Sequence, residues 1–157
     1  MNNIISKFNE ILNNENLDLI LQKTCDLLKN EKENYDWVGF YFKNGNKNEL
    51  KLGPFSGLAT DHDIIPFGKG ICGQVALSNE TFVVPDVMAQ DNYLSCNMHV
   101  KSEIVVPLFV FEQNIGQIDI DSNTLDAFKT EDKDLLNYIT KKIGQVFEKQ
   151  NKQLYYI

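Results

Sequence analysis

Two aspartates stand in an alternating pattern that could support acid–base or cation-binding chemistry. They occur in Ile118–Asp119–Ile120–Asp121. Because alternate residues of a strand share a face, both carboxylates should lie on one side, on the order of 7 Å apart. At an effective dielectric constant of about 20, two such charges repel by ~2 kcal/mol. The pair fits either a solvated face that also caps a helix, or an acidic pocket that binds a cation or keeps one carboxyl protonated. Glu103 opens the neighbouring predicted strand and could join the pair.

The sequence contains three cysteines, Cys25, Cys72 and Cys96, and no CxxC motif. This odd number, together with an N-terminal segment unlike an export signal, predicts reduced thiols in the cytosol. Cys25 lies at helical spacing from Leu21 and Leu28, which favours a small buried hydrophobic residue. Cys96 lies in a long loop, where a cysteine is more often functional than a packing residue, although an incidental thiol remains an alternative.

The segment Gly68–Lys69–Gly70–Ile71–Cys72–Gly73 matches GxGxxG. As a dinucleotide fingerprint it is weak, because Pro66 lies in the preceding strand and the surrounding pattern predicts hairpins. A tight turn is the better interpretation. It places Cys72 in the first turn of a short helix, where we expect the helix dipole to lower the pKa of the thiol. His62 and His99 lack metal-ligand spacing, so neither a metal nor a cofactor is expected.

These residues must be positioned by a mixture of helices and hairpins. Apolar residues at helical spacing predict a helical N-terminal third to about Glu31, with Asn16 as an N-cap, and a last helix from about Thr130. Between these helices, alternating or aromatic runs predict six strands, at residues 37–42, 49–52, 64–67, 81–84, 103–111 and 115–121. We therefore expect a single α+β domain over residues 1–157, with a mainly antiparallel sheet. The loop of ~16 residues before Glu103 is long enough to suggest a functional role.

Composition excludes several classes of function. The chain has 157 residues, of which 43% are hydrophobic and 24% are charged, as in an ordinary globular domain. Its 15 basic residues, all lysines, face 22 acidic ones, for a net charge of −7. An acidic surface without arginine disfavours nucleic acid as a partner. No apolar run approaches the ~20 residues of a membrane-spanning helix.

Taken in order, several segments resemble one family, the GAF-domain free methionine-(R)-sulfoxide reductases. The resemblance runs from about Trp37 to the C-terminal helix and is carried by these segments: Gly53–Pro54–Phe55–Ser56–Gly57, Gly68–Lys69–Gly70–Ile71–Cys72–Gly73, Cys96, Ser102–Glu103–Ile104–Val105–Val106–Pro107 and Ile118–Asp119–Ile120–Asp121–Ser122. It implies a six-stranded, mainly antiparallel sheet flanked by N- and C-terminal helices. It also implies a homodimer that reduces free methionine-(R)-sulfoxide, which agrees with the cytoplasmic location predicted from the cysteines.

The resemblance implies a role for each candidate residue. Cys96 corresponds to the nucleophile, Trp37 to the aromatic residue that packs on the substrate's methyl group, and Tyr41 to a neighbour of that site. The residues that correspond to the family's substrate-site carboxylates are Glu103, Asp119 and Asp121. Of these, Glu103 or Asp121 is expected to donate a proton to the sulfoxide oxygen while the thiolate attacks sulfur. The resulting sulfenic acid condenses with a second thiol to form a disulfide.

One departure concerns that second thiol. The family usually has a cysteine shortly after the Gly–Pro–Phe motif, whereas residues 58–63 contain none. Cys72 is therefore the expected internal resolving thiol, with a thioredoxin-like protein as reductant. The missing cysteine also supports an alternative, a non-catalytic GAF sensory module that holds a small ligand. A purely structural dimerisation domain is a third interpretation, but it leaves the acidic residues and the loop cysteine without a purpose.

Overall fold

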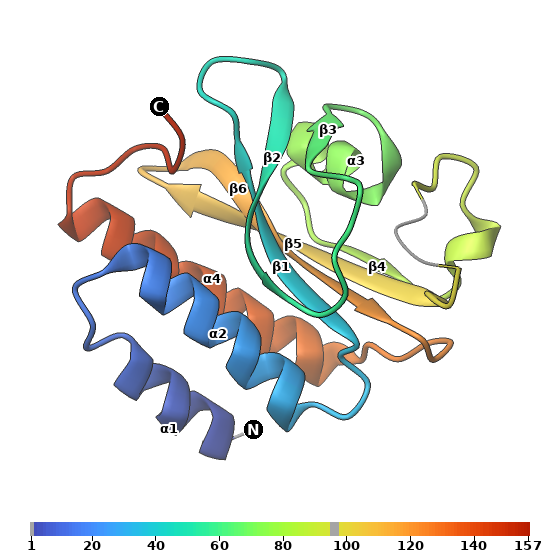
Figure 1. Ribbon diagram of the computed structural model, residues 1–157, viewed down its shortest axis with the longest axis horizontal. Coiled ribbons are helices and arrows are strands. Elements are labelled where there is room, and N and C mark those ends of the chain that lie inside the picture. The colour runs from blue at the N-terminus through green and yellow to red at the C-terminus, as the bar shows by residue number, and fades with distance from the viewer. Residues whose placement is uncertain (1, 95–97) are drawn as a thin grey trace.

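The computed structural model describes residues 2–94 and 98–157, which form helices on both faces of one curved sheet (Figure 1). The helices are α1 (Asn2–Ile11), α2 (Leu17–Glu31), α3 (Gly70–Ser78) and α4 (Thr130–Lys149), with a short 3₁₀ helix, η1 (Val87–Ala89). The strands are β1 (Trp37–Lys43), β2 (Glu49–Ser56), β3 (Ile64–Pro66), β4 (Phe82–Val84), β5 (Ser102–Val110) and β6 (Gln113–Ser122).

The six strands form one antiparallel sheet in the order β3-β2-β1-β6-β5-β4. The expected α+β class, with an antiparallel sheet between terminal helices, is confirmed. In Figure 1, α2 and α4 lie side by side on one face, with α1 packed outside α2. The opposite face carries α3.

Local sequence signals explain most element boundaries. Asn16 caps α2 by accepting a hydrogen bond on its side-chain oxygen from the Leu19 N–H, at 3.1 Å. The short strand β3 contains Pro66 and lies at the sheet edge, where a missing N–H donor is tolerated. Strand β2 continues to Ser56, four residues beyond the expected end at Leu52, because its second half pairs with the start of β1.

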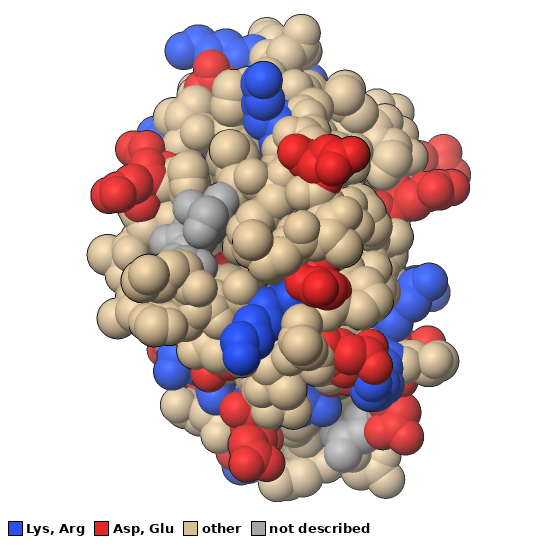
Figure 2. All heavy atoms as spheres, turned by 90° about the vertical axis from the view of Figure 1, so that its right-hand side faces the viewer, with Lys and Arg blue, Asp and Glu red and all other residues tan. Residues whose placement is uncertain are grey.

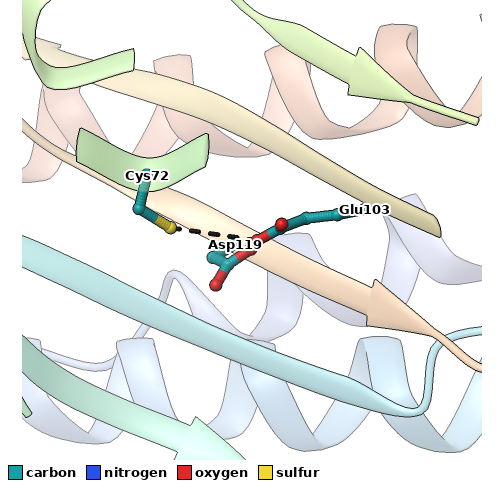
Figure 3. A group of neighbouring side chains, drawn as sticks. All are labelled: Cys72, Glu103 and Asp119. Carbon is teal, nitrogen blue, oxygen red and sulfur yellow. Dashed lines mark hydrogen bonds between the residues drawn. The ribbon is translucent and has the colours of Figure 1, made fainter. Parts of the chain in front are cut away.

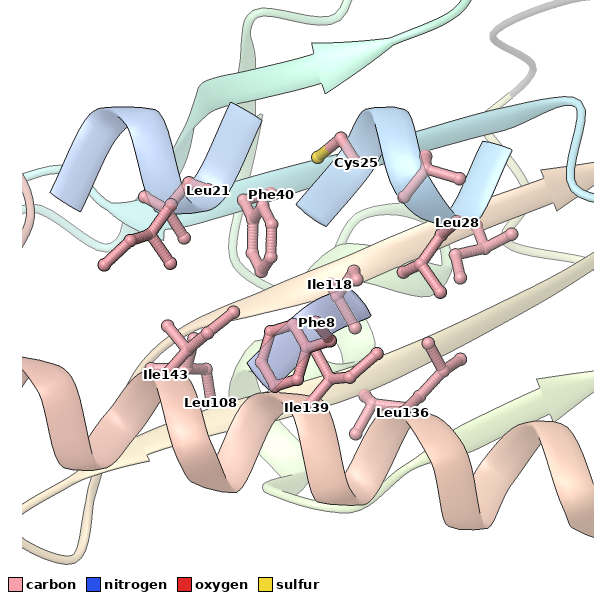
Figure 4. Close-up of a cluster of buried hydrophobic side chains, with 14 of the residues drawn as sticks. Phe8, Leu21, Cys25, Leu28, Phe40, Leu108, Ile118, Leu136, Ile139 and Ile143 are labelled. Atoms are coloured by element: carbon pink, nitrogen blue, oxygen red, sulfur yellow. The ribbon is translucent and has the colours of Figure 1, made fainter. Parts of the chain in front are cut away.

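The larger hydrophobic core lies between the sheet and the pair α2 and α4 (Figure 4). Isoleucines 118 and 120 of β6 point into it, as the alternation predicts. Cys25 is fully buried in this core, and its thiol donates a weak hydrogen bond to the Pro54 carbonyl, at 3.5 Å. Burial raises the pKa of this thiol. The prediction that Cys25 is a small buried hydrophobic residue is confirmed.

A smaller apolar cluster covers the opposite face of the sheet. It contains Trp37 and Tyr41 from β1, Val105 from β5, and Ile71 and Cys72 from α3. None of the described helices is both long and apolar enough to cross a lipid bilayer. Figure 2 shows the right-hand side of the view in Figure 1, and acidic side chains and lysines are interspersed on that face.

Candidate active site

A row of side chains crosses three neighbouring strands on the face that α3 covers. Asp121 of β6 stands opposite Glu103 of β5 on one side and Trp37 of β1 on the other. Asp119, two residues earlier, shares this face because side chains alternate along a strand. The structure thus brings together all three carboxylates singled out in the sequence, with the tryptophan beside them.

The three carboxylates are buried. Glu103, Asp119 and Asp121 are 5%, 1% and 3% exposed, which excludes the solvated-face interpretation. Burial raises the pKa of Asp119, although hydrogen bonds involving Glu103 and Cys72 oppose the shift. Burial also raises the pKa of Asp121 well above its ordinary value, and the charge of Asp119 adds to this effect. The sequence predicts that at least one of these carboxyl groups has a raised pKa, and this is confirmed. The main cause, however, is the loss of hydration on burial, and repulsion between the charges comes second.

The thiol of Cys72 points at this group from α3 (Figure 3). It donates a long hydrogen bond to Glu103 Oε2, at 4.0 Å. Burial raises its pKa well above the ordinary value, and the charges of Asp119, Glu103 and Asp121 raise it further. The expectation that the helix dipole would lower this pKa is therefore wrong. A thiol this buried and this close to carboxylates stays protonated at neutral pH.

The GxGxxG segment is a tight turn that brings α3 onto the sheet, as expected. Gly68 and Gly70 have φ values of 89° and 62°, which glycine adopts at little cost. Asn92 of the long loop fastens this turn, because its amide donates to Gly68 O at 2.6 Å and its oxygen accepts from Gly70 N at 3.1 Å. The start of the loop is thereby tied to the helix that carries Cys72.

Two aromatic residues of β1 extend the site. The Trp37 indole stacks on Phe55, with ring centroids 5.6 Å apart, and its N–H donates to Leu58 O at 3.0 Å. It lies against Gly39, where a Cβ atom would approach to 2.3 Å, so only glycine leaves room for the ring. Tyr41 is fully buried, and its hydroxyl donates to His62 O at 2.8 Å.

Two cavities lie among these residues. One of about 180 Å³ is lined by Trp37, Asp121, Leu58, Val100 and their neighbours. The other, of only about 10 Å³, is lined by Cys72, Glu103, Asp119 and residues that include His62. A wider hollow of about 700 Å³ lies elsewhere, beside α4 and the end of β5.

Cys96 lies outside the described residues, so its role as the nucleophile stays a prediction from the sequence.

Two residues that shape the site were not identified from the sequence. Gln117 lies two residues before Asp119 on the same strand face, and its amide donates to Cys72 O at 3.1 Å. The alternation that marked the aspartates could have identified it. Asn92 carried no comparable signal, because its partners are backbone atoms 22 and 24 residues away.

Comparison with known proteins places this geometry in a family. The GAF domain model matches residues 16–147. The free methionine-R-sulfoxide reductase of Saccharomyces cerevisiae is 39% identical over 112 residues, which are 70% of this chain and 62% of the yeast protein. The chain thus spans less than two thirds of that relative. The Escherichia coli free methionine-R-sulfoxide reductase is 35% identical over 80% of this chain and 74% of that protein.

A solved structure of a protein with the same name is also similar to this chain. The free methionine-R-sulfoxide reductase of Neisseria meningitidis, determined in complex with its substrate, is 34% identical to this chain. The two superpose with a TM-score of 0.88 over 94% of this chain and 87% of that one. With six antiparallel strands between terminal helices and a buried carboxylate row facing a cysteine, the chain belongs to the GAF-domain family of free methionine-(R)-sulfoxide reductases.

Proposed function

We propose that this protein reduces free L-methionine-(R)-sulfoxide to methionine with cysteine thiols. The observation that carries the proposal is the row of Glu103, Asp121 and Trp37 across three strands, because it sets acidic groups beside an aromatic surface. The substrate offers a matching set of groups, an ammonium, a polar S=O bond and an S-methyl group. The cavity of about 180 Å³ between Trp37 and Asp121 suits a small molecule better than a peptide.

The carboxyl groups divide two tasks between them. One carboxyl of the row, Glu103 or Asp121, donates a proton to the sulfoxide oxygen, and burial raises the pKa of Asp121 in the direction that favours this role. A neighbouring ionised carboxylate, Asp119 among the candidates, attracts the substrate's ammonium. The indole of Trp37 packs on the methyl group, and Tyr41 supports that wall through its bond to His62 O.

The thiolate of Cys96 attacks the sulfoxide sulfur while the carboxyl protonates the oxygen. The oxygen ends on the cysteine, so that Cys96 becomes a sulfenic acid and methionine leaves. Two electrons pass from the cysteine sulfur to the substrate sulfur. The Cys72 thiol then attacks the sulfenic acid, which forms a Cys72–Cys96 disulfide and releases water. Because burial raises the pKa of Cys72, its thiol gives up its proton as it attacks, and the departing hydroxide takes a proton and leaves as water.

The first test compares free methionine-(R)-sulfoxide with its N-acetyl derivative, with dithiothreitol as reductant. We expect turnover of the free compound and little of the acetylated one, because acetylation removes the ammonium. Equal rates on the two compounds would contradict the proposal. Loss of activity towards both, with binding of the free compound retained, would instead favour a GAF sensory module.

The second test replaces Glu103, Asp119 and Asp121, one at a time, by the isosteric amide. We expect at least one variant to lose about 10²-fold or more in kcat, the usual scale of general acid catalysis. Loss of ammonium binding would instead raise KM with kcat spared. Exposed Glu80, changed to Gln, is the matched control. Near-normal kinetics in all three variants would remove the catalytic role of the carboxyl groups.

The third test follows the sulfur chemistry by mass spectrometry. Cys96→Ser should abolish turnover, whereas Cys72→Ser should keep the first reductive step and slow recycling by a thioredoxin-like reductant. The wild-type protein should show a Cys72–Cys96 disulfide after one equivalent of substrate. Only sulfenic acid, or an intermolecular Cys96–Cys96 bond, would show that Cys72 is not the resolving thiol.

The proposal includes a homodimer that acts in the cytoplasm, which sedimentation and cell fractionation would test.

A further inference from the structure

The Cys72, Glu103 and Asp119 side chains converge from three different elements, α3, β5 and β6 (Figure 3). One donor atom from each, the thiol sulfur and two carboxylate oxygens, lies within 4.8 Å of the other two. Around a tetrahedral Zn²⁺ ion, with bonds of about 2.0–2.3 Å, ligand atoms lie about 3.5 Å apart. The three donor atoms therefore lie close to, but somewhat wider than, the spacing of zinc ligands.

A second, independent observation points to a missing ligand. Asp119 Oδ1 is fully buried and has no hydrogen-bond partner among the described residues. The only other such side-chain atom in residues 2–94 and 98–157 is Gln117 Oε1, two residues away on the same face of β6. Buried acceptors are nearly always paired, so an unpaired carboxylate oxygen here indicates that the site takes a donor or a cation.

The space beside these atoms has the size of an ion. The cavity that Cys72, Glu103 and Asp119 line, together with residues such as His62, measures about 10 Å³. That is roughly the volume needed for one water molecule or one small cation. It is far smaller than the neighbouring cavity of about 180 Å³ at Trp37, which we assign to the substrate. The two cavities therefore suit different occupants.

We propose that Cys72, Glu103 and Asp119 form a binding site for one Zn²⁺ ion. Zinc is the appropriate ion because one thiolate and two carboxylates are common zinc ligands, whereas hard Mg²⁺ and Ca²⁺ avoid sulfur. Binding of the ion would release a proton from any of these groups that is protonated, so the affinity should rise with pH. The sequence allowed a cation-binding acidic pocket at Asp119 with Glu103, but it did not connect Cys72 to that pocket, because these ligands are 31 and 16 residues apart.

Zinc binding would have a consequence for catalysis, which rests on the proposed function. The bound ion holds the resolving thiol of Cys72 and the proton-donating carboxyl of Glu103, so the zinc form cannot complete a catalytic cycle. Removal of zinc by a chelator restores both groups. The site thus acts as a reversible inhibitory site on the reductase.

The experiment titrates the reduced protein with Co²⁺, a spectroscopic substitute for Zn²⁺, with a phosphine as reductant so that no added thiol binds the metal. We expect one equivalent of Co²⁺, a sulfur-to-cobalt charge-transfer band, and displacement by Zn²⁺. Cys72→Ser should abolish the band, and Asp119→Asn should weaken binding by about 10-fold or more. Cys96→Ser, Cys25→Ala and the exposed control Glu80→Gln should keep both the band and the affinity.

Two results would overturn the proposal. The first is the absence of a charge-transfer band at millimolar Co²⁺. The second is a band that survives Cys72→Ser and disappears in Cys96→Ser, which would place the metal on the loop cysteine. Because this is an equilibrium measurement, it is independent of turnover. Turnover in chelator without Co²⁺ binding refutes the zinc site alone, whereas Co²⁺ binding without turnover refutes the proposed reaction alone.

Discussion

Replacing Asp121 by Asn should make the protein more stable at neutral and alkaline pH, although Asp121 is a candidate catalytic acid. Asp121 lies directly opposite Glu103, and such pairs have Cβ atoms about 5 Å apart. A hydrogen bond with Glu103 lowers the pKa of Asp121, whereas the charge of Asp119, about 7 Å away along the strand, repels that of Asp121 by ~2 kcal/mol at an effective dielectric constant of about 20. The folded protein avoids this repulsion only if Asp121 stays protonated. Keeping that proton at high pH lowers the free energy of unfolding.

The pH dependence follows from the raised pKa of Asp121, which burial causes first and the charge of Asp119 second. Below the ordinary carboxyl pKa of about 4, the folded and unfolded chains are both protonated, and Asp and Asn should be nearly equivalent. As the pH rises towards the raised folded-state pKa, the unfolded chain ionises freely and the folded chain does not. The wild-type protein therefore loses stability over this window, and the Asn variant does not.

The assay is thermal unfolding of both proteins at pH values from 4 to 8. A gain of about 2 kcal/mol would raise the Tm of a domain of this size by roughly 4–8 °C at pH 8, and the gain should shrink towards pH 4. Exposed Asp134, changed to Asn, is the control and should shift the Tm little at any pH. A Tm for Asp121→Asn that is unchanged or lower at pH 8 would refute the reasoning that buried carboxylates oppose folding here.

Two further predictions concern groups outside the carboxylate row. Burial raises the pKa of Asp132, but hydrogen bonds from the backbone N–H of Lys129, from Tyr35 and from Lys32 outweigh it and lower the pKa. Asp132→Asn should therefore lower the free energy of unfolding by about 1–3 kcal/mol at pH 7. Below the lowered pKa of Asp132 the loss should be almost zero, and a loss that is constant with pH would contradict this prediction. Gly39→Ala should displace the Trp37 indole, lower stability by about 1–3 kcal/mol and raise KM, as thermal unfolding and kinetics would show. The turn variant Gly45→Ala has space for a Cβ atom but places alanine at a φ of 58°, so it should lower stability and leave KM unchanged. An unchanged KM in Gly39→Ala would remove Trp37 from the substrate site.

Much of this protein's architecture is visible in local sequence patterns. The alternation in Ile118–Asp119–Ile120–Asp121 correctly predicts that the isoleucines enter one core and that the aspartates share the other face. Asn16 marks the start of α2, and Pro66 marks an edge strand. These features are local, because a strand repeats every two residues and a cap or a proline acts on its own backbone neighbours.

Only the tertiary structure decided what surrounds the aspartates. Strand β1 pairs with β6, about 80 residues away in sequence, and this pairing puts Trp37 opposite Asp121. A slip of one residue would have turned either side chain to the other face, and no local pattern determines that register. The chemistry of Cys72 shows the same limit. Its position in the first turn of a helix favours a low pKa, whereas folding buries the thiol against three carboxylates and raises the pKa. Dielectric environment and neighbouring charge arise from non-local packing, so they could not be read from the sequence around Cys72.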